Sequence, residues 1–221
     1  MFKRLSFLFA GLALATACSA GGADPAKAAA AAAAPAFTAD QYATIATPQR
    51  LDPKDGKVEV IEVFSYGCIH CAHYEPLAED LQKKLPKGVV FHAIPAAFND
   101  AWLPYAQSFY AAQKLGVLPK THAALFKAIH EDHFPLRTLE ELADWYAKSA
   151  GVDKAKFLAI ADSKETHDRI IADSKLIQAW GVDGTPSIIV NGKYRPATFK
   201  DFDELNAMTL FLVDKELKGG K

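Results

Sequence analysis

The sequence lacks an excess of charge of either sign. Its 221 residues include 25 lysines and arginines and 26 aspartates and glutamates, which gives a formal net charge of −1. Loss of a start that carries Lys3 and Arg4 would leave 23 basic residues against 26 acidic ones, or −3. Neither balance is typical of proteins that bind nucleic acid or another polyanion, so we expect no such partner.

The sequence also lacks an N-terminal apolar run long enough to cross a bilayer. Leu5–Leu14 is apolar but falls well short of the roughly 20 residues that a membrane helix needs. It follows the positively charged Met1–Arg4 and precedes the small residues Ala15-Thr16-Ala17. This order predicts a secretory signal peptide over residues 1–17 that is removed after export.

Cys18 stands directly after this predicted cleavage site. Leu14–Cys18 resembles the lipobox of bacterial lipoproteins, although the leucine lies four positions before the cysteine instead of the usual three. We therefore expect lipidation of Cys18; the alternative is ordinary cleavage that leaves a free thiol. Residues 18–36 contain seven alanines in a row and no large apolar side chain, so they are interpreted as a tether from a membrane anchor.

The rest of the chain, in which apolar residues are abundant, alternates between strand and helix patterns. Residues 57–65 are β-branched and nearly continuously apolar, which predicts a central strand covered on both faces. Helical spacing follows over 68–85, and a second strand over 89–95. This order predicts a βαβ unit with two parallel strands.

Helical patterns continue over 101–179, with breaks at 116–119, 133–137 and 151–153. Strand signals return at 185–190, and Asn191-Gly192 predicts a tight hairpin turn. A final amphipathic helix is expected over 201–217. The predicted fold class is α/β, three layers with a helical insertion after the second strand of the βαβ unit.

The main chemical signal is Cys68-Ile69-His70-Cys71, at the junction of a strand and a helix. The free N–H groups and the positive end of the helix dipole favour a thiolate on the first cysteine of such a pair. Cys68 is therefore the expected nucleophile and Cys71 the resolving thiol. His70 could stabilise the thiolate by hydrogen bonding or by its charge.

Other uses of a Cys-X-X-Cys pair fit less well. A closed disulfide within one helical turn would link residues that already lie together. Cys68, His70, Cys71 and His73 cannot all converge from one helix on a zinc ion, and the sequence lacks a second Cys-X-X-Cys. Covalent haem needs a histidine directly after the second cysteine, where Ala72 stands. We expect no metal and no cofactor.

Phe64–Cys71 resembles the active-site segment of the DsbA family of periplasmic oxidases, and the resemblance extends over about residues 40–217. It implies a thioredoxin fold with an inserted helical subdomain: residues 37–100 and 180–221 would form the thioredoxin-like domain, and 101–179 the insertion. Ile69 departs from the proline common in the family, which leaves the redox potential open.

The same resemblance implies roles for four more residues. Glu62 and Glu75 lie where the family carries acidic residues that move protons to and from the buried cysteine. For Glu75 an ordinary surface glutamate is an equal alternative. Gly184-Thr185-Pro186-Ser187 matches the loop that carries a cis-proline facing the disulfide, with Thr185 pairing with substrate peptide.

The resemblance implies that the chain donates its disulfide to reduced, unfolded exported proteins in the periplasm and is reoxidised by a DsbB-like membrane quinone reductase. We expect a monomer. The alternative is a disulfide isomerase or reductase of the same fold, although the chain has too few residues before the first strand for the dimerisation domain of such isomerases. A non-catalytic peptide-binding module is a third possibility, against which the intact cysteine pair argues.

Overall fold

The computed structural model describes residues 36–219. The predicted signal peptide, Cys18 and all but the last residue of the predicted tether lie outside this range. Within it, no helix is both long enough and apolar enough to cross a membrane.

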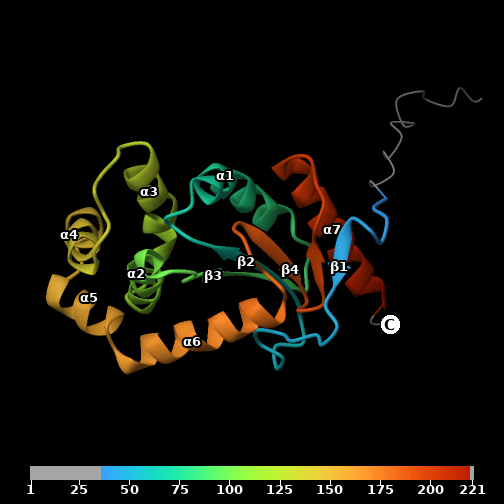
Figure 1. Cartoon of the computed structure of the whole chain (residues 1–221), viewed down its shortest axis with the longest axis horizontal. Helices are drawn as coiled ribbons and strands as arrows, with labels where there is room; N and C mark the ends of the chain where they lie inside the picture. Colours follow the sequence, from blue (N-terminus) through green and yellow to red (C-terminus); the bar gives the residue numbers. More distant parts are fainter. Residues whose placement is uncertain (1–35, 220–221) are drawn as a thin grey trace, which may run out of the picture. The chain divides into compact units, whose positions relative to one another are not determined.

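The described residues form one mixed sheet and the helices around it (Figure 1). In chain order the elements are β1 (Tyr42–Thr44), β2 (Val58–Phe64), α1 (Ile69–Lys84), β3 (Val89–Pro95), the 3-10 helix η2 (Asp100–Trp102), α2 (Leu103–Lys114), α3 (Leu118–His130), α4 (Leu139–Ala150), α5 (Lys154–Ala161), α6 (Lys164–Ala179), β4 (Ser187–Val190), β5 (Tyr194–Pro196) and α7 (Phe202–Gly219).

The order of strands across the sheet is β1-β5-β4-β2-β3. β2 pairs in parallel with β3, from Val58 opposite Val89 to Phe64 opposite Pro95, as the βαβ pattern predicts. β4 pairs antiparallel with the other side of β2. The predicted central strand is therefore central, and the cysteine pair follows its C-terminal end.

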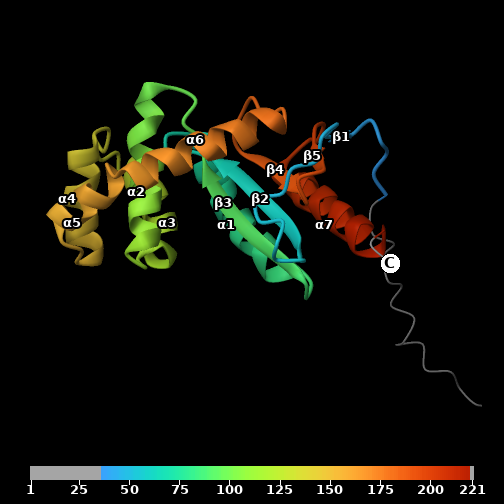
Figure 2. The same ribbon diagram turned by 90° about the horizontal axis from the view of Figure 1, so that it is seen from below.

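Alternate residues of β2 and β4 point to opposite faces of the sheet, each covered by a helix layer. Figures 1 and 2 place α1 and α7 on one face and α6 on the other. On the α1 and α7 side, Val60 packs with Tyr74, Leu81 and Met208. On the α6 side, Ile61 packs with Ile177 and Trp180.

Helices α2 to α5 gather at one end of the sheet, on the left in both views. The breaks between α2, α3, α4 and α5 fall where the sequence predicts them. A further break at 162–163, between α5 and α6, was not predicted. Ser163 causes it by capping α6, since its side chain accepts a hydrogen bond from the backbone N–H of Thr166.

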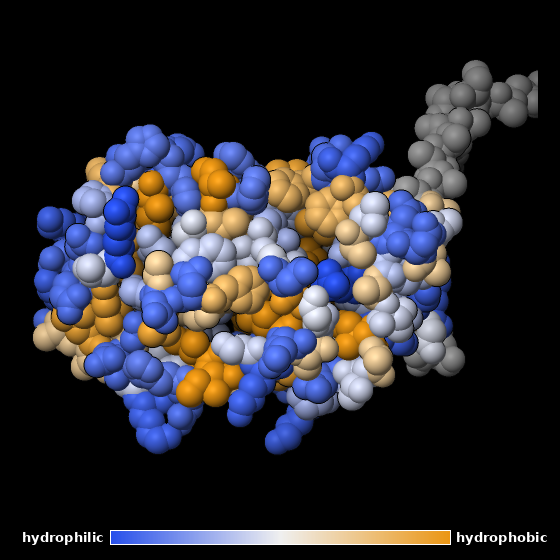
Figure 3. Space-filling model, in the orientation of Figure 1, coloured by the Kyte–Doolittle hydropathy of each residue, from blue (hydrophilic) through white to orange (hydrophobic). Residues whose placement is uncertain are grey.

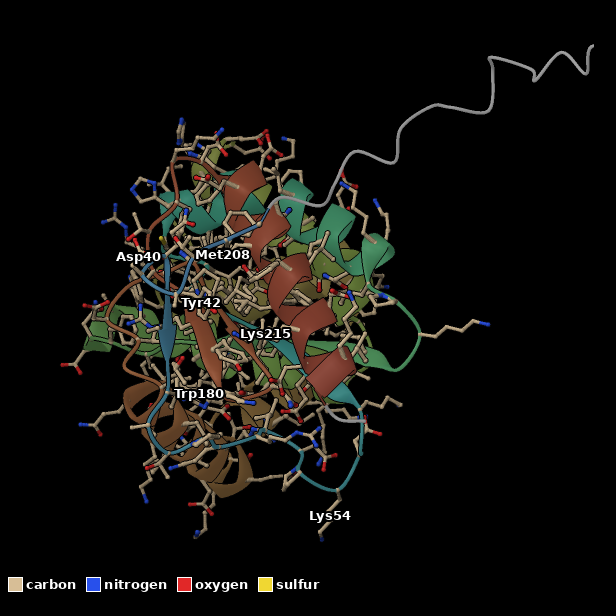
Figure 4. All side chains as sticks on the ribbon, turned by 90° about the vertical axis from the view of Figure 1, so that its right-hand side faces the viewer. Asp40, Tyr42, Lys54, Trp180, Met208 and Lys215 are labelled. Carbon is tan, nitrogen blue, oxygen red and sulfur yellow. The ribbon has the colours of Figure 1, made fainter. Side chains whose placement is uncertain are left out.

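The two short strands β1 and β5 complete the sheet beside α7. Asn191 and Gly192 both have positive φ, as the predicted hairpin turn requires. A Cβ on Gly192 would lie 2.0 Å from the carbonyl oxygen of Gln49, so no larger residue fits there. Tyr42 of β1 lies beside Lys215 of α7, whose ammonium donates to the phenol oxygen at 2.8 Å (Figure 4).

Most large apolar side chains are buried in this arrangement, with few exceptions among the described residues. The exposed ones are Ile69, Phe98, Phe134 and Ile171. On the face drawn in Figure 3, hydrophobic residues form separate patches among hydrophilic ones. Ile69 is noteworthy because it directly follows Cys68.

Candidate active site

Cys68 occupies the N-cap position of α1, one short turn after β2. Its backbone N–H donates to the carbonyl of Ser65 at 3.1 Å, and the N–H of Gly67 donates to the Ser65 hydroxyl at 3.2 Å. No side chain caps the helix, so the first N–H groups of α1 stay available to the Cys68 sulfur. A Cβ on Gly67 would lie 2.8 Å from Nε1 of Trp102, so a larger residue in this turn would have to displace the Trp102 side chain.

The two cysteines are free thiols in different surroundings. Cys68 is 9% exposed, whereas Cys71, one turn further along α1, is fully buried. The pKa of Cys68 is lowered to about 5, mainly by the hydrogen bond from the Cys71 thiol and further by Thr185 and the N–H groups of Cys71 and His70, against the effect of burial. Burial raises the pKa of Cys71 well above the ordinary thiol value. This asymmetry fits the predicted nucleophile and resolving thiol.

The loop before β4 faces the outer cysteine. The Thr185–Pro186 peptide bond is cis, which is the isomer that the resemblance implies. The Cys68 Sγ lies 3.3 Å from the carbonyl oxygen of Thr185, 117 positions away in the sequence. The structure therefore brings Thr185, Pro186 and Cys68 together.

The two residues between the cysteines are both exposed. Among the described residues, the His70 imidazole makes no hydrogen bond, and it is the backbone N–H of His70 that acts on the pKa of Cys68. The predicted hydrogen bond from the imidazole to the Cys68 sulfur is thus not found, because the His70 side chain is exposed at the first turn of α1, and an effect of its charge on the thiolate stays a prediction.

The two glutamates are both buried and line one cavity beside α1. Glu62 of β2 is 1% exposed and Glu75 of α1 is 6% exposed, so the surface alternative for Glu75 is wrong. The pKa of Glu62 is raised to about 8, mainly by burial and further by the nearby charge of Glu75. A carboxyl group that is protonated near neutral pH can both give and take a proton there.

Helix α3 supplies further polar groups that the sequence analysis did not single out. His122 Nε2 lies 3.3 Å from Oε2 of Glu75, and His122 Nδ1 lies 2.6 Å from the Tyr66 hydroxyl. His130 Nε2 lies 2.7 Å from the backbone oxygen of Tyr66. No sequence motif marks these histidines, because they reach the site only through the packing of α3 on α1.

The described residues include no group of three or more His, Cys, Asp or Glu side chains arranged to hold a metal ion. The site thus contains two thiols of different pKa, the backbone carbonyl of Thr185 beside the outer sulfur, and two buried carboxyl groups. Together with the sheet and helix order, they define a thiol-disulfide oxidoreductase of the thioredoxin fold.

Comparison with known proteins identifies the group within this class. A family model described as thioredoxin matches residues 52–207. The chain is 40% identical to the thiol:disulfide interchange protein DsbA of Pseudomonas aeruginosa over 183 residues, which is 82% of this chain and 86% of that protein. It is 38% identical to DsbA of Burkholderia cepacia over 195 residues, or 88% and 87% of the two chains.

A solved structure, the oxidoreductase DsbA from Xylella fastidiosa, superposes with a TM-score of 0.76 at 35% identity and covers 80% of this chain and 96% of that one. The chain belongs to the DsbA family of thiol:disulfide interchange proteins. The predicted fold class, a thioredoxin fold with inserted helices, and the predicted enzyme class are confirmed.

Proposed function

We propose that this member of the family acts as a dithiol oxidase that donates its Cys68–Cys71 disulfide to newly exported proteins. A substrate thiolate attacks the Cys68 sulfur, the bond between the two enzyme sulfurs breaks, and Cys71 leaves as a thiolate. A second substrate thiolate then attacks the substrate sulfur of the mixed disulfide and releases Cys68. The substrate gains a disulfide and the enzyme keeps two thiols.

The observation that carries this proposal is the lowered pKa of Cys68, to about 5. At neutral pH the thiolate stabilises the reduced enzyme by about 2 kcal/mol relative to an ordinary thiol, allowing for screening by solvent. Because this stabilisation is lost in the disulfide form, the disulfide becomes a stronger oxidant by roughly 40 mV. The same low pKa makes Cys68 a good leaving group in the second step.

The buried glutamates supply the proton chemistry in this proposal. Cys71 needs a proton when it leaves and must lose one when the disulfide re-forms, since burial disfavours its thiolate. Glu62, with a pKa of about 8, is the proposed donor and acceptor. We propose that the charge of Glu75 helps to set the pKa of Glu62.

The proposed substrate site is the partly exposed loop that carries the cis-proline. An extended peptide would pair with the backbone of Thr185, which holds its cysteine next to Cys68. Ile69 is 42% exposed beside that cysteine and would add an apolar contact. Such recognition through backbone and apolar groups suits unfolded chains of many sequences.

We further propose that the enzyme works in the periplasm, as the signal pattern over residues 1–17 suggests, and that it is tethered there through a lipidated Cys18 and residues 18–36. Its proposed reoxidant is a DsbB-like membrane quinone reductase, and we propose that it acts as a monomer. Residues 37–100 and 180–221 would act as the redox domain and 101–179 as its helical cap.

A reductase or isomerase of the same fold is the alternative, and Ile69 in place of the usual proline is the feature that favours it. The test is the equilibrium between glutathione and the Cys68/Cys71 pair, measured on protein expressed from the full chain. If the protein is an oxidase, the reduction potential of its disulfide should lie well above that of glutathione. Its reduced form should also unfold at a higher urea concentration than its oxidised form. A value near that of thioredoxin would assign the reductase function instead.

A further inference from the structure

A cavity of about 390 Å³ opens beside the buried glutamates, between α1, β3, α2 and α3. The titratable groups that line it come from three elements besides α3: Glu62 from β2, His92 from β3, and Glu75 and Glu79 from α1, with His122 itself from α3. The proposed oxidase cycle passes a proton to and from Glu62 in every turnover, yet Glu62 is only 1% exposed. The cavity is the feature that joins this carboxyl group to solvent.

Two polar atoms at the cavity support the presence of water in it. Oε1 of Glu62 and Nε2 of His92 are both buried and have no hydrogen-bond partner among the described residues. Buried polar atoms of this kind are normally satisfied by ordered water, and a site of this size has room for several molecules at about 30 Å³ each. Water in the cavity would connect Glu62 with the groups on its wall.

His122 lines this cavity from α3, and its two ring nitrogens face different groups. Nδ1 lies 2.6 Å from the hydroxyl of Tyr66, whose pKa burial raises well above its ordinary value, so this phenol keeps its proton. Nε2 lies 3.3 Å from Oε2 of Glu75, a distance at which the charged imidazole and the carboxylate form an ion pair. The His122 side chain is 18% exposed, against 8% for Glu75.

We propose that His122 is a relay residue that carries protons between solvent and the Glu62–Glu75 pair through the water of this cavity. The inference rests on the proposed function, because it assumes that Glu62 exchanges protons with Cys71. Imidazole suits this place, since it takes up and releases protons near neutral pH. His122 lies next to Glu75 and not next to the reacting sulfurs. Its effect is therefore on the rate at which Glu62 loses its proton to solvent.

The step that exposes this role is closure of the enzyme disulfide. When Cys68 is joined to glutathione, Cys71 gives its proton to the Glu62 carboxylate and attacks the Cys68 sulfur, and glutathione leaves as a thiolate. Glu62 must first have lost its own proton to the relay. Closure is intramolecular, so its rate does not depend on the concentration of a reagent.

The experiment measures this closure rate by rapid quenching between pH 6 and 9, using oxidised glutathione as the probe. The variants are His122→Gln and His122→Ala, in protein expressed from the full chain. Glutamine can still donate a hydrogen bond to Glu75 but cannot carry a proton. His133→Asn is the matched control, since His133 is exposed and lines no part of the cavity.

The relay predicts that both His122 variants close roughly tenfold more slowly at pH 7, while the control closes at the normal rate. Added imidazole should restore closure in His122→Ala and leave the unsubstituted protein unchanged. The equilibrium constant with glutathione should stay within about twofold, since a relay changes rates and not end states.

Closure at the normal rate in His122→Gln would overturn the proposal, because a hydrogen-bond donor would then suffice. So would slow closure that imidazole does not restore and that comes with a shifted equilibrium constant, since that combination indicates a structural role. A normal closure rate in Glu62→Gln would instead refute the proton role of Glu62 in the proposed function. An equilibrium constant of the unsubstituted protein with glutathione near that of thioredoxin would refute the oxidase function itself.

Discussion

Strand β2 buries two glutamates, Glu59 in its first half and Glu62 in its second half, and the two carboxyl groups have opposite surroundings. Glu59 is 0% exposed and accepts hydrogen bonds from the N–H groups of Leu51 and Asp52, with Arg50 at 3.5 Å. Glu62, three residues on, has an unpartnered oxygen and another carboxyl group as its neighbour. A buried charge whose hydrogen bonds are satisfied holds the fold together, whereas one left unsatisfied is available for chemistry.

The largest effect is expected from Glu59→Gln. Loss of the charge leaves Arg50 without its buried partner and weakens the two backbone contacts, at a cost of about 3 kcal/mol. Urea unfolding should show this loss, while the glutathione equilibrium of the cysteine pair should not move. A shift in that equilibrium would mean that Glu59 influences the cysteine pair, and it would contradict the assignment of a purely structural role to Glu59.

Glu62→Gln should have the opposite effect on stability. The pKa of Glu62 is about 8 in the folded state, against 4.5 for an ordinary glutamate in the unfolded chain. Between pH 4.5 and about 8 the unfolded chain therefore gains stability by ionising this carboxyl group, and the folded state becomes less stable relative to it as the pH rises. Removing this carboxyl group should stabilise the protein by about 2–3 kcal/mol at pH 7 to 8. Below pH 4.5 the gain should vanish.

The measurement is urea unfolding of both proteins at pH 4 and pH 7.5, combined with the closure rate of the disulfide. The more stable variant should close more slowly, as expected where a functional group costs stability. Destabilisation at pH 7.5 would contradict this account of Glu62.

A smaller effect is expected from Glu75→Gln, which removes the secondary cause of the raised pKa of Glu62. The pKa of Glu62 should fall but stay above the ordinary value, because burial is the larger cause. Infrared spectra of the carboxyl band against pH would follow this titration, with Glu62→Gln identifying the band. An unchanged midpoint would show that the Glu75 charge does not act on Glu62.

The smallest effect is expected at Cys68. Its pKa of about 5 depends mainly on Cys71, Thr185 and backbone N–H groups, against the effect of burial, and neither glutamate is among these main causes. The rate of Cys68 alkylation should rise with pH around a midpoint near 5 and keep that midpoint in both Glu59→Gln and Glu62→Gln. A displaced midpoint in either variant would show that the thiolate senses the strand beneath it.

The sequence predicts the parts of this site that a local pattern encodes. Strand β2, helix α1 and the placement of Cys68 at the helix start follow from residues 57–85 alone, since periodicity and the end of a strand are local properties. The position of Pro186 opposite Cys68 came only from resemblance to a family, because pairing of β4 with β2 joins residues more than 100 positions apart.

What the sequence could not supply depends on α3. The sequence does not show that Glu75 is buried, because the residues of α3 that lie against it are far away in the chain. His122 has no sequence feature that distinguishes it from an ordinary histidine in a helix. The break at Ser163 was missed because a serine cap inside a long helical pattern is a weak signal. Glu59 was missed for a similar reason: its partners come from the irregular segment before β2.

The contact between Cys68 and Thr185 also has a consequence for the order in which the enzyme is made. The cysteines leave the ribosome long before residue 185 does, since 117 positions separate Cys68 from Thr185. Until that late segment has arrived and packed, the Thr185 side chain does not yet contribute to the low pKa of Cys68, and the nascent Cys68 is closer to an ordinary thiol. Part of the oxidising power of this protein is thus acquired only at the end of its own synthesis, so an unfinished copy should be a weaker oxidant than its completed siblings.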